Sequence, residues 1–465
     1  MTRGTPLLLV LFAAVVVRAG TVLGLDSDYV LHLAYGRAIL AHGPWLAEDP
    51  TIYTAPGLPP ILHEWGAEAL FAALERLSGA WGPVRLAALI GALVPWLLFR
   101  RAWRETGSFW PAMTAWVVSA AGIATGLLVR PHLFSVAAFY ASCRLLERWR
   151  ATGDHRRVFP VLAVLVVLWT NLHGGGALVW LPVLLGLYAF DNRQVAGAAV
   201  LPFFYALTLL NPWGLALHRH VLRFLASPAP QVAADMGPPD LASGTLLVML
   251  LLTAALGLAV WRRFRPAGRT PVSIAAIAFA VSWLSMRNLP LLGVALGLLL
   301  PEILAGWLTE RPALAERSRQ LAASEPARPI VPWALAVLAL VPLPGVPQPR
   351  PVGPQVPEAA IAWLGAHPEL GRRHGYADYD DAGFLLDARV VDRVYLHSLN
   401  ANTPLFLAHD RLQLDGGGPL WPRLFDRHQV AWALVRPGEP LAARLGEAGW
   451  LRRWAAGDRV LLARP

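Results

Sequence analysis

Two residue types are missing or nearly so from this chain of 465 residues. It has no lysine, since all of its 40 basic residues are arginine, and Cys143 is its only cysteine. Without lysine there is no lysine Schiff base and no Walker A phosphate loop, because both need the ammonium group. A single cysteine excludes a secreted scaffold built on disulfides.

Charge is also scarce. Only 15% of the residues are charged and 56% are hydrophobic, against about 25% and about 45–50% in a typical soluble domain. The apolar residues come in long blocks, which is typical of a chain that crosses a bilayer. The net charge of +10 fits arginines that flank membrane helices, so no nucleic-acid partner is predicted. The motifs G-x-S-x-G, H-E-x-x-H and G-x-G-x-x-G are absent, which leaves the common hydrolase and nucleotide-binding chemistries without support.

The apolar blocks predict an all-α polytopic membrane bundle of about eleven helices. Several are shorter than the roughly 20 residues of a perpendicular crossing, so they must be tilted, broken or shielded by neighbours. A signal peptide is the alternative for the first block. The predicted spans are 5–25, 83–99, 110–129, 133–149, 158–171, 174–190, 195–210, 242–261, 271–286, 289–308 and 330–346.

Arginine counts predict the orientation. With the N-terminus in the cytoplasm, eighteen arginines fall in inside segments and seven in outside segments, the bias that the positive-inside rule demands. An odd number of spans then places the C-terminal part outside. We therefore predict a multi-pass membrane protein with the N-terminus in the cytoplasm and the C-terminal domain outside.

The C-terminal part differs in composition from the rest. Residues 1–346 form the predicted transmembrane domain, residues 347–357 a proline-rich linker that cannot continue a helix, and residues 358–465 a small extracytoplasmic α/β domain. ALVRPGEPLAARLGEAGWLRRW and RVLLARP predict a strand, a helix and a closing strand, and DDAGFLLDA and RVYLH predict further short strands.

The first outer loop, residues 26–82, carries two predicted amphipathic helices, DYVLHLAYGRAIL and EWGAEALFAALERLSG. Asp26 and Asp28 precede the first of them. Two carboxylates at this spacing are candidates for a catalytic base and for ligands of a divalent cation, Mg²⁺ or Mn²⁺; a helix N-cap is the alternative. His63 and Glu64 add an imidazole and a carboxylate, or simply begin the second helix.

Further polar residues lie at predicted helix ends on the outer side. Arg130 and Arg287 each precede a turn with proline, and an arginine at membrane depth needs an anionic partner or a wet cavity. Either arginine is a candidate phosphate ligand, and pairing with Asp26 or Asp28 is the rival interpretation. His132, Asn171 and His173, the last two beside three glycines, complete the candidate substrate-binding set. We expect all these residues to converge on one outward-facing cavity.

Several short motifs in one order resemble those of GT-C membrane glycosyltransferases, in particular a poorly characterised bacterial group. They are DSDYVLHLAYGRAIL, DPTIYTAPG, HEW, RPHLFS, NLHGG and NPWG, within residues 26 to about 300. The resemblance implies a polyprenyl-phosphate-sugar donor, with Asp28 or Asp26 as base or metal ligand near the acceptor. It also implies that Arg130, His173 and Arg287 lie near the donor phosphate.

The predicted function is transfer of a sugar from a lipid-linked donor to an envelope glycan, lipid or protein on the extracytoplasmic face. Membrane lipids are the other expected partners. The alternatives are a transporter or flippase, and a non-catalytic receptor or assembly protein. A transporter is expected to show related half-repeats and ionisable groups near mid-span, and the sequence has neither.

Overall fold

The computed structural model of the protein describes residues 25–191, 196–228, 237–238, 252–254, 257, 269–323, 356–400 and 404–465. Its internal contacts divide the chain into two compact units. Unit 1 comprises residues 1–23, 77–214 and 234–349, and unit 2 comprises residues 24–76, 215–233 and 350–465. The first predicted outer loop and the C-terminal part therefore belong to the same compact unit.

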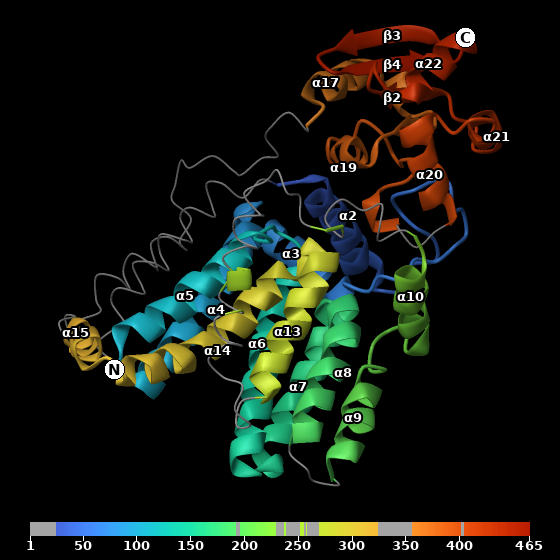
Figure 1. The fold of residues 1–465 in the computed structure, drawn as a ribbon. Helices are drawn as coiled ribbons and strands as arrows, with labels where there is room; N and C mark the ends of the chain where they lie inside the picture. Colours follow the sequence, from blue (N-terminus) through green and yellow to red (C-terminus); the bar gives the residue numbers. More distant parts are fainter. Residues whose placement is uncertain are drawn as a thin grey trace. The chain divides into compact units, whose positions relative to one another are not determined.

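The described part of unit 1 is built from helices. Short turns join several of them: Gly107 and Gly153 take left-handed backbone angles (φ 59° and 67°) and close the preceding helices with hydrogen bonds back to Trp103 and Trp149. In chain order the helices are α4 (Trp81–Thr106), α5 (Phe109–Ala124), α6 (His132–Thr152), α7 (His155–Leu172), α8 (Gly174–Asp191), α9 (Ala196–Leu207), α13 (Arg269–Leu284), η2 (Met286–Asn288), α14 (Leu289–Thr309) and α15 (Pro312–Ala323) (Figure 1).

Helices α5 and α14 approach each other closely through glycine. A Cβ atom on Gly122 would lie 2.7 Å from the Cα of Gly293, and one on Gly293 would lie 2.9 Å from the Cα of Gly122. Gly297, one turn further along α14, faces the Ala115 carbonyl at 3.2 Å in the same way. Small residues at a helix contact are typical of membrane bundles, because they let the backbones pack tightly.

Eight of the eleven predicted spans fall on described residues, and each is a helix, α4 to α9, α13 and α14. The predicted spans 5–25 and 330–346 lie outside the described residues, as do most of 242–261 and of the linker 347–357. By length and composition, three of the described helices can cross a membrane: Trp81–Thr106, His155–Leu172 and Met286–Thr309. The count of eleven stays a prediction.

The first loop in unit 2 holds the two helices that the sequence predicts, α2 (Ser27–His42) and α3 (Trp65–Ser78). The sequence predicts an apolar stripe on α2 made of Tyr29, Leu33, Gly36 and Leu40, with His32 and Tyr35 on the adjoining polar face, and this prediction is only partly correct. Leu40 is 50% exposed, whereas the polar His32 and Tyr35 are 2% exposed. The reason is that α3 packs against this helix: a Cβ atom on Gly36 would lie 2.1 Å from the backbone oxygen of Glu68.

The C-terminal part of unit 2 is an α/β structure with a four-stranded sheet in the order β1-β2-β4-β3. β1 and β2 are parallel, and β4 pairs antiparallel with both β2 and β3. Unit 2 also contains α10 (Leu215–Ala226). The C-terminal elements are α17 (Glu358–Ala366), α18 (Pro368–Gly371), β1 (Gly375–Ala377), α19 (Tyr379–Asp387), η3 (Ser398–Asn400), α20 (Pro404–Asp415), α21 (Leu420–Arg427), β2 (Trp432–Val435), α22 (Pro440–Glu447), β3 (Leu451–Ala456) and β4 (Arg459–Ala463) (Figure 1).

The strand, the helix and the closing strand predicted near the C-terminus are confirmed as β2, α22 and β4, and the structure adds β3 between α22 and β4. The strand predicted for DDAGFLLDA is wrong, because this segment lies in the helix α19. Its Ala382, Gly383, Phe384 and Leu385 are all buried, so the continuous apolar run reflects a helix enclosed by neighbours. The strand predicted for RVYLH is reduced to a single bridge between Val394 and Ile52.

This bridge belongs to a junction between the first loop and the C-terminal part. Tyr53 donates its hydroxyl to the Gly375 carbonyl at 2.9 Å, and Thr54 donates to the Tyr395 carbonyl at 2.6 Å. Ile52 and Tyr53 are buried in the same apolar core as the strands. The segment DPTIYTAPG is therefore a docking segment that holds the loop against the α/β structure.

Candidate functional site

The predicted site residues divide between the two units. Unit 2 holds Asp26, Asp28, His63 and Glu64, and unit 1 holds Arg130, His132, Asn171, His173 and Arg287. Each group is described within its own unit.

In unit 1, four of the five residues are brought together by turns at one end of the helices. Arg130 lies just before α6 and His132 begins that helix, His173 lies between α7 and α8, and Arg287 lies in η2 before α14. The His132 imidazole interacts electrostatically with Arg130, His173 and Arg287. The structure thus places two guanidinium groups and two imidazoles in one neighbourhood, although they are up to about 150 positions apart in the sequence.

The two imidazoles in this group are held in place from several sides. His132 Nε2 lies 2.6 Å from the carbonyl oxygen of Gly126. His173 Nδ1 lies 2.6 Å from Ser135 Oγ, which also accepts a hydrogen bond from the indole of Trp169 at 2.7 Å. Gly176 makes room for this contact, because a Cβ atom there would lie 2.1 Å from Ser135 Oγ. The glycines that follow His173 are therefore the first turn of α8 and not an open loop.

The side chain of Asn171, in the last turn of α7, binds backbone carbonyl groups. Its amide donates to the carbonyls of Val167 and Leu210, both at 2.8 Å. The second of these bonds ties the end of α7 to the segment that follows α9. These contacts give Asn171 a structural role at the end of α7.

In unit 2, Asp26 and Asp28 have different surroundings. Asp26 is the N-cap of α2 and accepts a hydrogen bond from the backbone N–H of Tyr29 at 2.9 Å, the capping alternative of the sequence analysis. Asp28, one position into the helix, accepts a short hydrogen bond from the Ser398 hydroxyl. It also interacts electrostatically with His32 and His397. Asp28 therefore lies among a hydroxyl and two imidazole groups.

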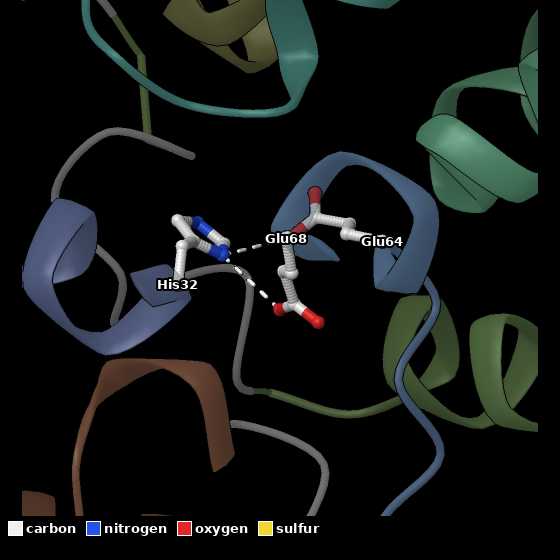
Figure 2. Close-up of side chains that lie close together, drawn as sticks. All are labelled: His32, Glu64 and Glu68. Atoms are coloured by element: carbon white, nitrogen blue, oxygen red, sulfur yellow. Dashed lines mark hydrogen bonds and ion pairs between the residues drawn. The ribbon is translucent and has the colours of Figure 1, made fainter. Parts of the chain in front are cut away.

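A buried cluster of one histidine and two glutamates lies where α2 meets α3 (Figure 2). His32 Nδ1 is 3.2 Å from Glu68 Oε1 and 3.8 Å from Glu64 Oε2. His32, Glu64 and Glu68 are 2%, 8% and 3% exposed. In the part of the chain that the structure describes, this is the group of His, Cys, Asp and Glu ligand atoms that comes within reach of a single metal ion. Asp26 and Asp28 are not members of it.

The cluster stabilises the protonated, positively charged form of His32. Burial works against protonation of His32, but the hydrogen bond to Glu68 and the charge of Glu64 outweigh it, so the pKa of His32 is raised. Burial also raises the pKa of Glu68, against the opposing effect of His32. A plain ion pair would lower the pKa of its carboxylate. At Glu68, burial therefore outweighs the ion pair with His32, and the charge of Glu64 adds to the rise.

His63 lies next to this cluster. Its Nε2 is 3.7 Å from Glu64 Oε1, and its ring lies 5.7 Å from that of His220 in α10. The side chain of His63 is about one third exposed. The pKa of His220 is lowered to about 3, mainly by burial and further by the charges of His63 and Arg223. His63 and Glu64, neighbours in the sequence, thus both lie at the His32 cluster, and their role in substrate binding stays a prediction.

A second buried network joins the first loop to the C-terminal part. Asp49 accepts hydrogen bonds from the Tyr35 hydroxyl at 2.7 Å and from Thr51 Oγ1 at 2.5 Å. Thr51 Oγ1 lies 2.8 Å from Nε2 of His397. His397 is fully buried and directly precedes Ser398, the partner of Asp28. The C-terminal part therefore helps to position Asp28.

The sequence analysis missed several of these residues. The spacing of Glu64 and Glu68, four positions apart in a predicted helix, was an available signal because it puts both carboxylates on one face. His32, four positions after Asp28, shares a face with it for the same reason. His397 and Ser398 carried no signal, since only the tertiary fold brings them to α2.

No family model and no curated protein matches the sequence. Solved structures do match. The chain is similar to ArnT from Cupriavidus metallidurans bound to undecaprenyl phosphate (TM-score 0.55, 14% identity, covering 98% of this chain and 97% of that one). It is similar to the oligosaccharyltransferase AglB from Archaeoglobus fulgidus in complex with an inhibitory peptide and a dolichol-phosphate (TM-score 0.58, 13% identity, 92% and 69%). A structure of the A. fulgidus enzyme tethered to an acceptor peptide matches as well (TM-score 0.54, 12% identity, 92% and 68%). The predicted GT-C fold is confirmed by these likenesses.

Proposed function

We propose that this protein is a glycosyltransferase of the bacterial cytoplasmic membrane. It moves a sugar from a polyprenyl-phosphate donor to an envelope glycan, lipid or protein on the extracytoplasmic face. The observation that carries the proposal is the gathering of Arg130, His132, His173 and Arg287 at one end of unit 1, in a fold whose representative ArnT binds undecaprenyl phosphate.

The basic group of unit 1 supplies the chemistry that a lipid-phosphate donor needs. A phosphate carries its charge on several oxygens, and planar guanidinium groups bind such oxygens in pairs. As the bond from the anomeric carbon to the phosphate oxygen breaks, negative charge grows on the leaving polyprenyl phosphate. Arg130 and Arg287 stabilise that charge, and His132 and His173 add hydrogen-bonding nitrogens.

Asp28 supplies the base. In the proposed reaction the acceptor hydroxyl gives its proton to the Asp28 carboxylate while its oxygen forms a bond to the anomeric carbon. Polyprenyl phosphate leaves with the electron pair of the broken bond, so the reaction needs no oxidant and no nucleotide. Ser398 orients the carboxylate through the hydrogen bond to Asp28, and Asp26 holds the start of the helix on which Asp28 lies.

The test compares two neighbouring substitutions in cells. A deletion strain is complemented with the wild type, Asp28→Asn or Asp26→Asn, and its envelope lipids, glycans and proteins are compared by mass spectrometry. We expect Asp28→Asn to lower transfer by about 100-fold or more, since removal of a general base typically costs this much. Asp26→Asn should retain transfer, because asparagine caps a helix as well as aspartate does.

Melting of the purified variants in detergent controls for folding. Retained transfer in a folded Asp28→Asn protein would contradict the assignment of the base, and loss in Asp26→Asn alone would move it to Asp26. If deletion leaves every envelope sugar in place and changes the uptake of a solute, the protein is a transporter and the proposal is wrong.

A further inference from the structure

The cluster of His32, Glu64 and Glu68 has the geometry of metal ligands. In a tetrahedral site with bonds of about 2.0–2.2 Å, two ligand atoms lie about 3.3 Å apart. The Nδ1 atom of His32 lies 3.2 Å from Oε1 of Glu68 and 3.8 Å from Oε2 of Glu64. One ligand atom from each of the three residues lies within 4.8 Å of the other two. In Figure 2 both carboxylates turn toward the same nitrogen of the imidazole.

Charge supplies a second argument. Two carboxylates buried beside one imidazole leave an excess of negative charge, which is costly away from water. One divalent cation with a neutral imidazole would bring the site to zero net charge. Glu68 Oε2 is buried and accepts no hydrogen bond, although a buried carboxylate oxygen normally does. A cation bound at Glu68 would satisfy this carboxylate.

The site is also built in advance. Glu64 directly precedes α3, Glu68 lies four positions further on in its first turn, and His32 faces both from α2. One turn beyond His32, Gly36 lets the two backbones touch, with the position of its missing Cβ atom 2.1 Å from the carbonyl oxygen of Glu68. Any larger residue there would push the ligands apart, so the close approach of the helices fixes the distances between them.

We infer that His32, Glu64 and Glu68 bind one divalent transition-metal ion, with a water molecule or an outside group in the fourth position. One imidazole and two carboxylates suit Zn²⁺ best, and Mn²⁺ next. Mg²⁺ prefers oxygen ligands alone. The inference goes beyond the proposed sugar transfer and does not depend on it. It also assigns the cation to residues other than the predicted ligands Asp26 and Asp28.

The test measures metal directly. Full-length protein without a histidine tag is stripped with chelator in detergent and dialysed against Zn²⁺ or Mn²⁺, and bound metal is counted by mass spectrometry. We expect about one equivalent of Zn²⁺ on the wild type and a higher melting temperature with the metal than without it. Glu68→Gln and His32→Gln should weaken binding by more than about 100-fold, since even loss of an outer partner of a metal ligand typically costs about 10–100-fold.

Glu75→Gln is the matched control. Glu75 lies on the same helix, and its carboxylate pairs with Arg37 at 2.6 Å outside the cluster, so this variant should bind the metal as the wild type does. The X-ray absorption spectrum of the Zn²⁺-loaded wild type should show one nitrogen and two carboxylate oxygens. This measurement stays decisive if a cluster variant fails to fold. Absence of stoichiometric metal on the wild type, or equal affinity in folded Glu68→Gln, would overturn the inference.

Discussion

The buried side chain of His397, in the C-terminal part, contacts Thr51 of the first loop. Its titration should be visible in the stability of the protein. Burial lowers the pKa of His397 from 6.5 to about 4, although the carboxylates of Asp49 and Asp28 oppose the shift and His32 adds to it. Between these values the unfolded chain binds a proton that the folded protein does not. The free energy of unfolding should therefore fall as the pH drops from about 6.5 to about 4, by up to about 3 kcal/mol.

We expect His397→Gln to flatten this dependence, because glutamine keeps a side-chain donor for Thr51 and does not titrate. Melting temperatures in detergent from pH 7 to pH 4, with a chelator present, provide the measurement. His42→Gln, which removes an exposed histidine at the end of α2, is the control and should keep the wild-type slope. An unchanged slope in His397→Gln would contradict the assignment.

At the same scale, the sequence predicted the proximity of some side chains but not their contacts. Arg130 and Arg287 share a neighbourhood around His132, as expected, and the roles of the candidate residues in catalysis and binding stay predictions. The capping role of Asp26 follows from a local rule and was available as an alternative. The partners of Asp28 were not, because Ser398 is 370 positions away and no local pattern encodes that contact.

At the level of elements, helix packing in unit 1 depends on glycine in a way that a substitution can test. Gly293→Ala should destabilise the protein by roughly 1–3 kcal/mol, because its new methyl group would lie 2.9 Å from the Cα of Gly122 with no flexible side chain to move aside. Thermal melting in detergent measures the effect.

Gly306 offers a control on the same helix. A Cβ atom there meets nothing within 4 Å, so Gly306→Ala should be neutral or slightly stabilising, since alanine favours helix over glycine by roughly 1 kcal/mol. If the two variants melt alike, the contact between α5 and α14 does not have the closeness described here.

Elements were the easiest part of the fold to predict. Long apolar blocks with turn residues between them identify helices, and all eight of the described spans follow that rule. The rule fails for α19 because a short apolar run fits a buried strand and a buried helix equally well. It fails in part for α2, where the burial of His32 and Tyr35 depends on α3 and on the C-terminal part, which the periodicity of α2 alone cannot reveal.

For the whole molecule, the division into two units changes how the sequence order is understood. Residues 24–76 and 350–465 lie far apart in the chain and fold together, and the described helices between them, apart from α10, belong to the other unit. Composition alone separated the C-terminal part from the rest. It could not pair that part with the first loop, because such pairing rests on contacts as specific as the bridge between Ile52 and Val394.

This pairing has a consequence for topology, because the first loop and the C-terminal part must lie on the same side of the membrane. Arginine counts predict that this side is the outside. A cysteine introduced at Leu58, which is 63% exposed in the first loop, should react with a membrane-impermeant maleimide in right-side-out vesicles. A cysteine at the exposed position Arg156, at the start of α7, should react only after permeabilisation. The wild type supplies the blank, since its single cysteine, Cys143, is fully buried.

Labelling of Arg156→Cys in sealed vesicles and protection of Leu58→Cys would show the opposite orientation. Asp28 would then lie on the cytoplasmic side, where the proposed donor and acceptor are not presented.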